Sequence, residues 1–163
     1  YGKMVKPSDE LIVSFARRLA EANQRWRAEL ALRLGPLGLS QARGLILHYL
    51  SIHGDGLQQN ELADIVGIRG STLVRQLDRL ESDGWVARRN DPDDRRAKTI
   101  HLSDKAAPMV RKIENIIEQL RSEFLSGLTD AQLKTCFAVF DHIHERIDKG
   151  IGRNTPTRAT GSR

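Results

Sequence analysis

Basic and polar side chains gather in two consecutive stretches of this 163-residue chain, where they are suited to contact an anionic polymer. The first stretch, Ser71–Asp83, has the three- and four-residue apolar spacing of a helix. The face opposite its leucines carries Ser71, Thr72, Arg75, Gln76 and Arg79. The second stretch, Arg88–Leu102, combines basic residues with a Pro- and Asp-rich turn, which is typical of a hairpin. A helix that fits the major groove, followed by a basic hairpin, predicts a winged helix-turn-helix that binds DNA.

The elements around these stretches are expected to be mainly helical. Two short helices, about 59–66 and 71–83, are joined by a Gly-containing turn, which is typical of a helix-turn-helix. Segments 85–88 and 99–102 are rich in β-branched or aromatic residues and are expected to pair as strands. The predicted fold is therefore mainly α with a small β wing. It comprises an N-terminal dimerisation helix (1–38), a winged helix-turn-helix domain (39–103), C-terminal dimerisation helices (104–149) and a disordered basic tail (150–163).

The net charge of +5 favours an anionic partner. Part of this charge comes from the segment that starts at Lys149, which contains no acidic residue. We expect this segment to be either a solvated tail or a source of non-specific attraction to phosphates. A single cysteine, Cys136, excludes an internal disulfide bond and fits a reducing compartment. The first residues lack the apolar stretch of a signal peptide, so a cytoplasmic location is expected.

The predicted helices outside the winged helix-turn-helix domain, which we call the reading head, carry more apolar surface than so small a domain can cover. Examples are Leu11 and Phe15 near the start of the chain, and Phe137 and Phe140 near its end. Burial against a second copy is the expected solution, so the chain is predicted to form a homodimer. An intramolecular packing of the three outer helices is the alternative.

Two segments resemble the MarR family of bacterial regulators, and within it the SlyA-like branch. Leu73–Gly84 looks like the recognition helix of the family, and Asp94–Ser103 looks like its Asp-x-Arg wing motif, which ends in Leu-Ser. Weaker similarity covers Arg25–Arg27 and Leu39–Gln41. The resemblance implies a homodimeric transcriptional regulator that binds a pseudo-palindromic operator, and we expect it to act as a repressor.

The predicted recognition helix supplies two groups of DNA contacts. Side chains near the N-terminus of such a helix meet base edges, which makes Ser71, Thr72 and Arg75 the candidates for sequence readout. Gln76 and Arg79 are expected nearer the DNA backbone or the rim of the groove. For Arg75, a phosphate contact without sequence information is the alternative.

The predicted wing supplies further contacts. Arg96 resembles the arginine of the family that enters the minor groove, and Asp94 resembles the carboxylate that holds this arginine in place. An Asp94–Arg96 ion pair that stabilises the wing without a role in DNA binding is the alternative. Arg95 and Lys98 are predicted to contact phosphates.

The resemblance also implies a small-molecule effector, because members of this family bind small aromatic acids between the dimer helices and the reading head. The candidate pocket residues are Trp26, Arg43, His48 and Tyr49. An arginine beside aromatic walls suits a carboxylate, a phenol or an acyl-CoA thioester. Core positions are the alternative for Trp26 and Tyr49, as is an interior position for His48. Gly44 makes room either for a ligand or for close helix packing.

No pattern in the sequence indicates catalysis. A phosphate-binding glycine loop and a His-Glu-x-x-His helix are absent, and His142 and His144 are two residues apart, so they do not face the same way. We therefore expect neither enzymatic activity nor a cofactor nor a metal. Thiol-redox sensing through Cys136 is an alternative regulatory input, although a buried structural thiol is favoured. An architectural or ligand-independent winged-helix DNA-binding protein is a further alternative.

Overall fold

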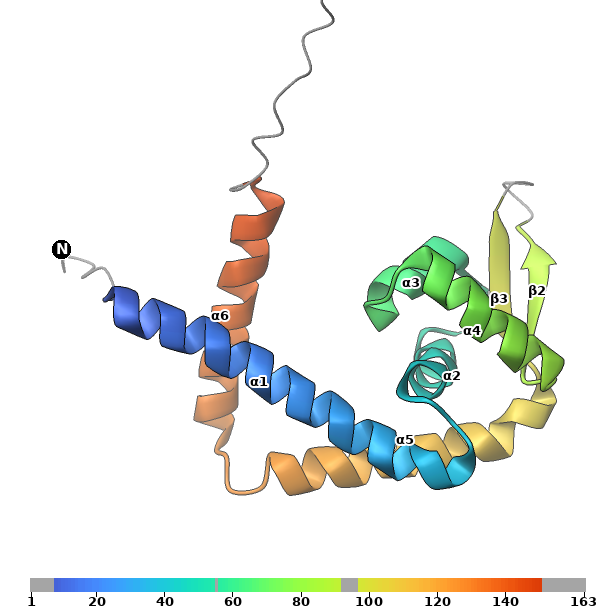
Figure 1. The fold of residues 1–163 in the computed structure, drawn as a ribbon, viewed down its shortest axis with the longest axis horizontal. Coiled ribbons are helices and arrows are strands. Elements are labelled where there is room, and N and C mark those ends of the chain that lie inside the picture. Colours follow the sequence, from blue (N-terminus) through green and yellow to red (C-terminus); the bar gives the residue numbers. More distant parts are fainter. Residues whose placement is uncertain (1–7, 55, 92–96, 151–163) are drawn as a thin grey trace, which may run out of the picture. The chain divides into compact units, whose positions relative to one another are not determined.

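The computed structural model describes residues 8–54, 56–91 and 97–150, which are mainly helical and include one small sheet (Figure 1). These residues form two compact units, the first ending at Ser122 and the second beginning at Glu123. The elements in chain order are α1 (Asp9–Leu34), the 3-10 turn η1 (Gly35–Leu37), α2 (Gln41–His53), β1 (Leu57–Gln58), α3 (Gln59–Val66), α4 (Gly70–Ser82), β2 (Val86–Asn90), β3 (Lys98–Leu102), the 3-10 turn η2 (Asp104–Ala106), α5 (Ala107–Phe124) and α6 (Asp130–Asp148). The prediction of a mainly α fold with a small β wing is confirmed. Within the described ranges, no helix is both long and apolar enough to cross a membrane.

The helix-turn-helix consists of α3 and α4, close to the predicted bounds. A capping interaction fixes the start of α3, since the Gln58 backbone N–H donates to Glu61 Oε2 at 3.1 Å. The helix ends at Gly67, whose φ of 71° is a left-handed conformation that glycine adopts without strain. The predicted apolar stripe of α4 is fully buried and consists of Leu73, Leu77 and Leu80. This stripe holds α4 on the core, so the opposite face of the helix points outward.

The sheet is antiparallel, with the strand order β1-β3-β2. The predicted pairing of the two wing strands is confirmed, with Val86 opposite Leu102 and Asn90 opposite Lys98. The third strand, β1, was not predicted, because a two-residue segment has no periodicity to reveal it. Leu57 of β1 pairs with Ile100, which joins the start of α3 to the central strand of the wing.

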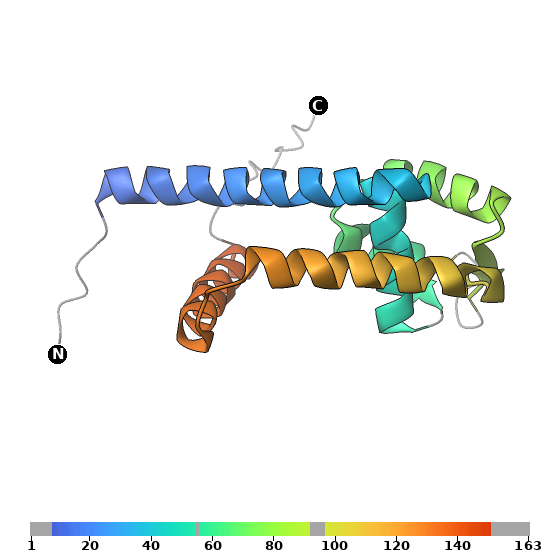
Figure 2. The same ribbon diagram turned by 90° about the horizontal axis from the view of Figure 1, so that it is seen from below.

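The core of the first unit lies where the second half of α1 meets α2, α4 and α5. Its fully buried large side chains are Leu34, Ile46, Leu47, Leu50, Leu62, Leu73, Leu77, Leu80, Ile100, Ile113 and Leu120. Figure 2 shows α1 and α5 running past α2 in opposite directions. At Gly44 of α2, a Cβ atom would lie only 2.5 Å from Leu34 Cδ1. The absence of a side chain at this position therefore permits close packing of α2 on α1.

The first half of α1 and the whole of α6 leave their apolar residues exposed. The only buried residues of α1 are Leu30 and Leu34, while Leu11 is 64% exposed. No residue of α6 is buried, and Phe137 is 57% exposed. Cys136 is exposed as well, so its interpretation as a buried thiol is wrong for the single chain. The physical reason is that, among the described residues of the second unit, no second complete helix packs over α6.

Candidate nucleic-acid interface and ligand pocket

The outward face of α4 carries the side chains predicted to contact DNA. Ser71, Arg75 and Arg79 are exposed, and Thr72 and Gln76 are half-buried at the edges of this face. Because residues four apart lie in one row on a helix, the three exposed residues form a line opposite the leucine stripe. In the part of the chain that the structure describes, no carboxylate lies within ion-pair distance of Arg75 or Arg79. Both guanidinium groups are available to a phosphate or a base edge.

Of the wing residues predicted to bind DNA, Lys98 lies within the described residues, and Asp94, Arg95 and Arg96 lie outside them. Lys98 is the first residue of β3 and is exposed. Its Nζ donates a hydrogen bond to Oδ1 of Asn90, the residue opposite it on β2. The ammonium group therefore lies at the same end of the sheet at which β2 ends.

Arg88 belongs to the basic stretch but bonds inward, to α4. Its Nη2 donates to Asp78 Oδ1 at 2.7 Å and to the Val74 carbonyl at 3.1 Å, and its Nη1 donates to Glu81 Oε2 at 2.8 Å. These charge-assisted hydrogen bonds leave the Arg88 side chain only 19% exposed. The residue thus attaches β2 to α4, and little of its charge is free for a contact with DNA.

The residue that follows β2, Asp91, has a buried carboxylate. Asp91 is 8% exposed, and its Oδ2 accepts a hydrogen bond from Gln58 Nε2 at 2.9 Å. Its backbone N–H donates to the Ala97 carbonyl at 3.2 Å, which joins the two ends of the segment 92–96. Sequence reasoning treated Asp91 only as a turn residue and did not identify this pair.

Three of the four predicted effector residues line one cavity of about 110 Å³ in the first unit. Trp26 comes from α1, and His48 and Tyr49 come from α2. The other lining residues are Leu30, Leu45, Ile117, Leu120 and Arg121. The predicted combination of aromatic walls and a cation is therefore present, although its cation is a different arginine.

The fourth predicted residue, Arg43, does not line this cavity. Its Nη2 donates to the Gly38 carbonyl at 2.8 Å, and its Nη1 lies 3.6 Å from the carboxylate of Asp83. Arg43 thus links α2 to the turn before it and to the end of α4. The arginine of the cavity is Arg121, which sequence reasoning missed. Its position four residues after Ile117, on the apolar row of α5, was the signal that could have identified it.

His48 is the one buried titratable residue among the lining side chains. It is 6% exposed, and within the described residues neither ring nitrogen has a hydrogen-bond partner. Burial lowers the pKa of His48 most, the nearby charge of Arg121 lowers it further, and the charge of Glu114 acts in the opposite direction. The folded protein therefore favours a neutral imidazole at this position.

This lowered pKa predicts how stability depends on pH. The unfolded chain binds a proton at His48 near the ordinary pKa of 6.5, whereas the folded chain resists it. The contribution of His48 to stability is thus complete above that pH and declines as the pH falls below it. We expect His48→Gln to lose less unfolding free energy than the wild type between about pH 7.5 and about pH 5.5. Urea denaturation across this range measures the difference, with His53→Gln, an exposed histidine of the same helix, as the control. An unchanged pH dependence in His48→Gln would contradict the assignment.

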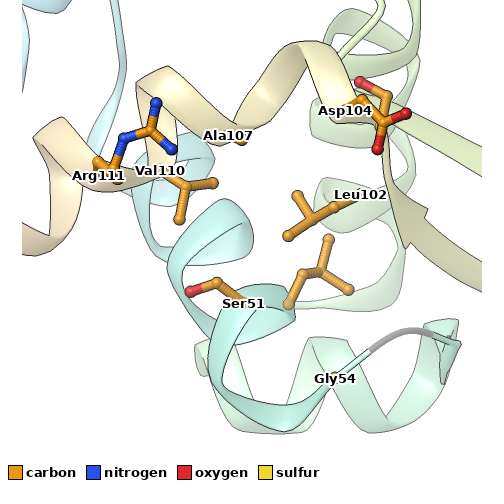
Figure 3. Close-up of a pocket in the computed structure, with 9 residues that line it drawn as sticks. Ser51, Gly54, Leu102, Asp104, Ala107, Val110 and Arg111 are labelled. Atoms are coloured by element: carbon orange, nitrogen blue, oxygen red, sulfur yellow. The ribbon is translucent and has the colours of Figure 1, made fainter.

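A larger cavity of about 430 Å³ lies between the end of α2 and the start of α5 (Figure 3). Leu50, Leu102 and Val110 form its apolar wall, and the charged residues Asp104 and Arg111 also line it. None of the predicted effector residues is among the residues that line it. Within the described ranges, no group of three or more His, Cys, Asp or Glu residues is arranged to hold a metal ion.

Comparisons with known proteins agree with this architecture. The sequence model of the MarR family matches residues 37–97, which span α2, the helix-turn-helix and the first wing strand. The solved structure of the transcriptional regulator PA3341 is 43% identical, with a TM-score of 0.78, and the match covers 83% of this chain and 98% of that one. A MarR-family transcriptional regulator from Silicibacter pomeroyi is 26% identical, with a TM-score of 0.74 and coverage of 87% and 97%. A cysteine mutant of MarR from E. coli, complexed with operator DNA, has the same fold at 24% identity and a TM-score of 0.70, with coverage of 85% and 99%.

Proposed function

The chain belongs to the MarR family, and on this basis we propose that it is a sequence-specific DNA-binding protein that represses transcription. The observation that carries the proposal is the row formed by Ser71, Arg75 and Arg79 on α4, which presents two guanidinium groups that have no carboxylate partner among the described residues. Lys98 adds a further cation from the adjacent wing. A protein with this fold has been solved in complex with operator DNA, which supports a DNA-binding role for this chain. Membership of the SlyA-like branch and a cytoplasmic location stay predictions.

DNase footprinting on genomic fragments from the source organism tests the proposal. A sequence-specific regulator protects a short inverted repeat, because a twofold protein places its recognition helices in half-sites about one duplex turn apart. Broad protection without a preferred sequence would instead favour the architectural alternative. A reporter that carries the protected site downstream of a promoter then tests repression directly.

The exposed apolar residues of α1 and α6 support the proposal of a homodimer. Leu11, Phe15 and Phe137 are all exposed large hydrophobic side chains in the single chain. Patches of this kind mark association surfaces, and a second copy of the chain covers them symmetrically.

Phe137→Glu is therefore expected to raise the dissociation constant of the dimer by at least about tenfold, because burial of an unpaired carboxylate costs several kcal/mol. Sedimentation equilibrium over a concentration series measures this change. Lys134→Glu, which alters an exposed residue of the same helix, is the control. A wild-type protein that is monomeric throughout the series would overturn the homodimer.

We also propose that a small aromatic carboxylate or phenol binds the cavity lined by Trp26, His48, Tyr49 and Arg121. The aromatic side chains supply apolar walls, and the guanidinium group suits an anionic oxygen. A volume of about 110 Å³ favours a ligand with one ring over the nucleotide portion of an acyl-CoA thioester. Such a ligand releases DNA only if it binds more tightly to the protein conformation in which the two recognition helices do not match the operator.

Arg121→Gln is expected to weaken binding of benzoate or salicylate by about tenfold or more, because it removes a charge-assisted hydrogen bond. Calorimetric titration measures the affinity, and loss of the operator complex measures the response. Arg43→Gln is the matched control, since Arg43 bonds to Gly38 and does not line the cavity. Equal losses of affinity in the two variants would mean that Arg121 does not contact the ligand. If neither acid binds or releases the operator, ligand-independent regulation is favoured.

A further inference from the structure

We propose that Asp91 and Gln58 form a clasp that positions the wing for DNA, a role that rests on the proposed function. The clasp is the hydrogen bond of 2.9 Å from Gln58 Nε2 to Asp91 Oδ2. It connects the residue after β2 to the residue immediately before α3, so it links the root of the wing to the helix-turn-helix.

Backbone pairing between the strands does not attach Asp91 to α3. The last strand pair between β2 and β3 is Asn90 opposite Lys98, and β1 pairs with β3 only at Ile100 and Thr99. Asp91 lies beyond the last pair, where its N–H to the Ala97 carbonyl closes the hairpin without attaching it to α3. The side chain of Gln58 supplies this attachment.

The charge of Asp91 argues for the same role. A carboxylate near a DNA-binding surface repels phosphates, which disfavours DNA binding. Burial of the carboxylate also removes its hydration, which disfavours folding. Asp91 is nevertheless only 8% exposed, and one of its interactions is the hydrogen bond that Oδ2 accepts from Gln58 Nε2. A positional role of this hydrogen bond gives a buried carboxylate a use at the root of the wing.

The clasp and simple electrostatics predict effects of opposite sign. Removal of one negative charge strengthens DNA binding if charge alone matters. If the clasp positions the wing, Asp91→Ala instead weakens binding to the footprinted duplex by about tenfold, because a hydrogen bond to a charged group is lost. Asp64→Asn removes an exposed carboxylate from α3 and is the control with the same change in charge.

An exchange of donor and acceptor makes the test specific. Gln58→Glu places two carboxylates against each other and is expected to weaken DNA binding at least as much as Asp91→Ala. The double variant Gln58→Glu/Asp91→Asn restores a donor–acceptor pair in the opposite direction, with the net charge of the wild type. We expect it to recover most of the affinity. Thermal unfolding of each variant checks that the fold is retained.

Amide hydrogen exchange tests the clasp without DNA. The Asp91 N–H, which donates to the Ala97 carbonyl, is expected to exchange faster in Gln58→Glu and to return toward the wild-type rate in the double variant. Any one of three results would overturn the clasp. They are a wild-type exchange rate of the Asp91 N–H in Gln58→Glu, an undiminished affinity for DNA in Asp91→Ala, and no recovery of either quantity in the double variant. A wild-type protein that protects no DNA rejects the proposed function instead, and hydrogen exchange then still decides whether the clasp exists.

Discussion

Arg75→Ala is expected to weaken operator binding by about 5- to 150-fold, the effect of losing one good contact between a side chain and a base. Arg75 is exposed, lies between Ser71 and Arg79 in the outward row of α4, and has no carboxylate partner among the described residues. A guanidinium group at this position is suited to bond both acceptors of a guanine, which alanine cannot replace. Fluorescence anisotropy with operators that differ at one base pair measures the change. The discrimination between bases at the contacted position is expected to relax.

Lys98→Ala is the comparison that distinguishes a base contact from a phosphate contact. A phosphate contact carries no sequence information, so the variant should bind all duplexes less tightly to the same degree. The slope of log affinity against log salt concentration should fall by about one unit. If Arg75→Ala behaves in the same way at every base, Arg75 contacts a phosphate, and readout of the sequence belongs to other residues.

The largest expected effect on folding comes from Leu77→Ala, which should lower the free energy of unfolding by about 2–5 kcal/mol. Leu77 is fully buried at the centre of the stripe that holds α4 on the core. The truncation removes apolar contacts and leaves a cavity that the surrounding helices fill only in part. Urea denaturation followed by circular dichroism measures the loss, at one fixed protein concentration because a dimer gains apparent stability with concentration.

Val74→Ala is the control on the same helix. Val74 is 37% exposed, so its truncation should change the free energy of unfolding by only about 0.5 kcal/mol. Equal losses in the two variants would mean that α4 does not pack through its leucine stripe.

Local patterns in the sequence were sufficient to predict most of the fold. The leucine stripe of α4, the glycine at the turn before it and the two strands of the wing all depend on residues close together in the chain. Ser8 and Ser40 likewise cap α1 and α2 through contacts only three residues long. Such features follow from periodicity and capping, which a single sequence displays directly.

The parts that sequence reasoning missed depend on contacts between distant residues. β1 exists because Leu57 meets Ile100, and nothing in the two-residue segment itself indicates a strand. Arg121 was missed, and Arg43 was chosen, because only packing reveals which arginine faces Trp26 and Tyr49. Arg88 was grouped with the basic residues of the wing because its carboxylate partners on α4 become its neighbours only after folding.

Arg88 donates four hydrogen bonds to α4, three from its guanidinium group and one from its backbone N–H, and they join β2 and α4 into a single mechanical body. For the effector proposed above, we therefore expect no bend between β2 and α4 and a displacement of the two elements together. The residues proposed to bind the effector and those proposed to bind DNA then form separate sets. Under this proposal, either set is free to diverge while the other is retained.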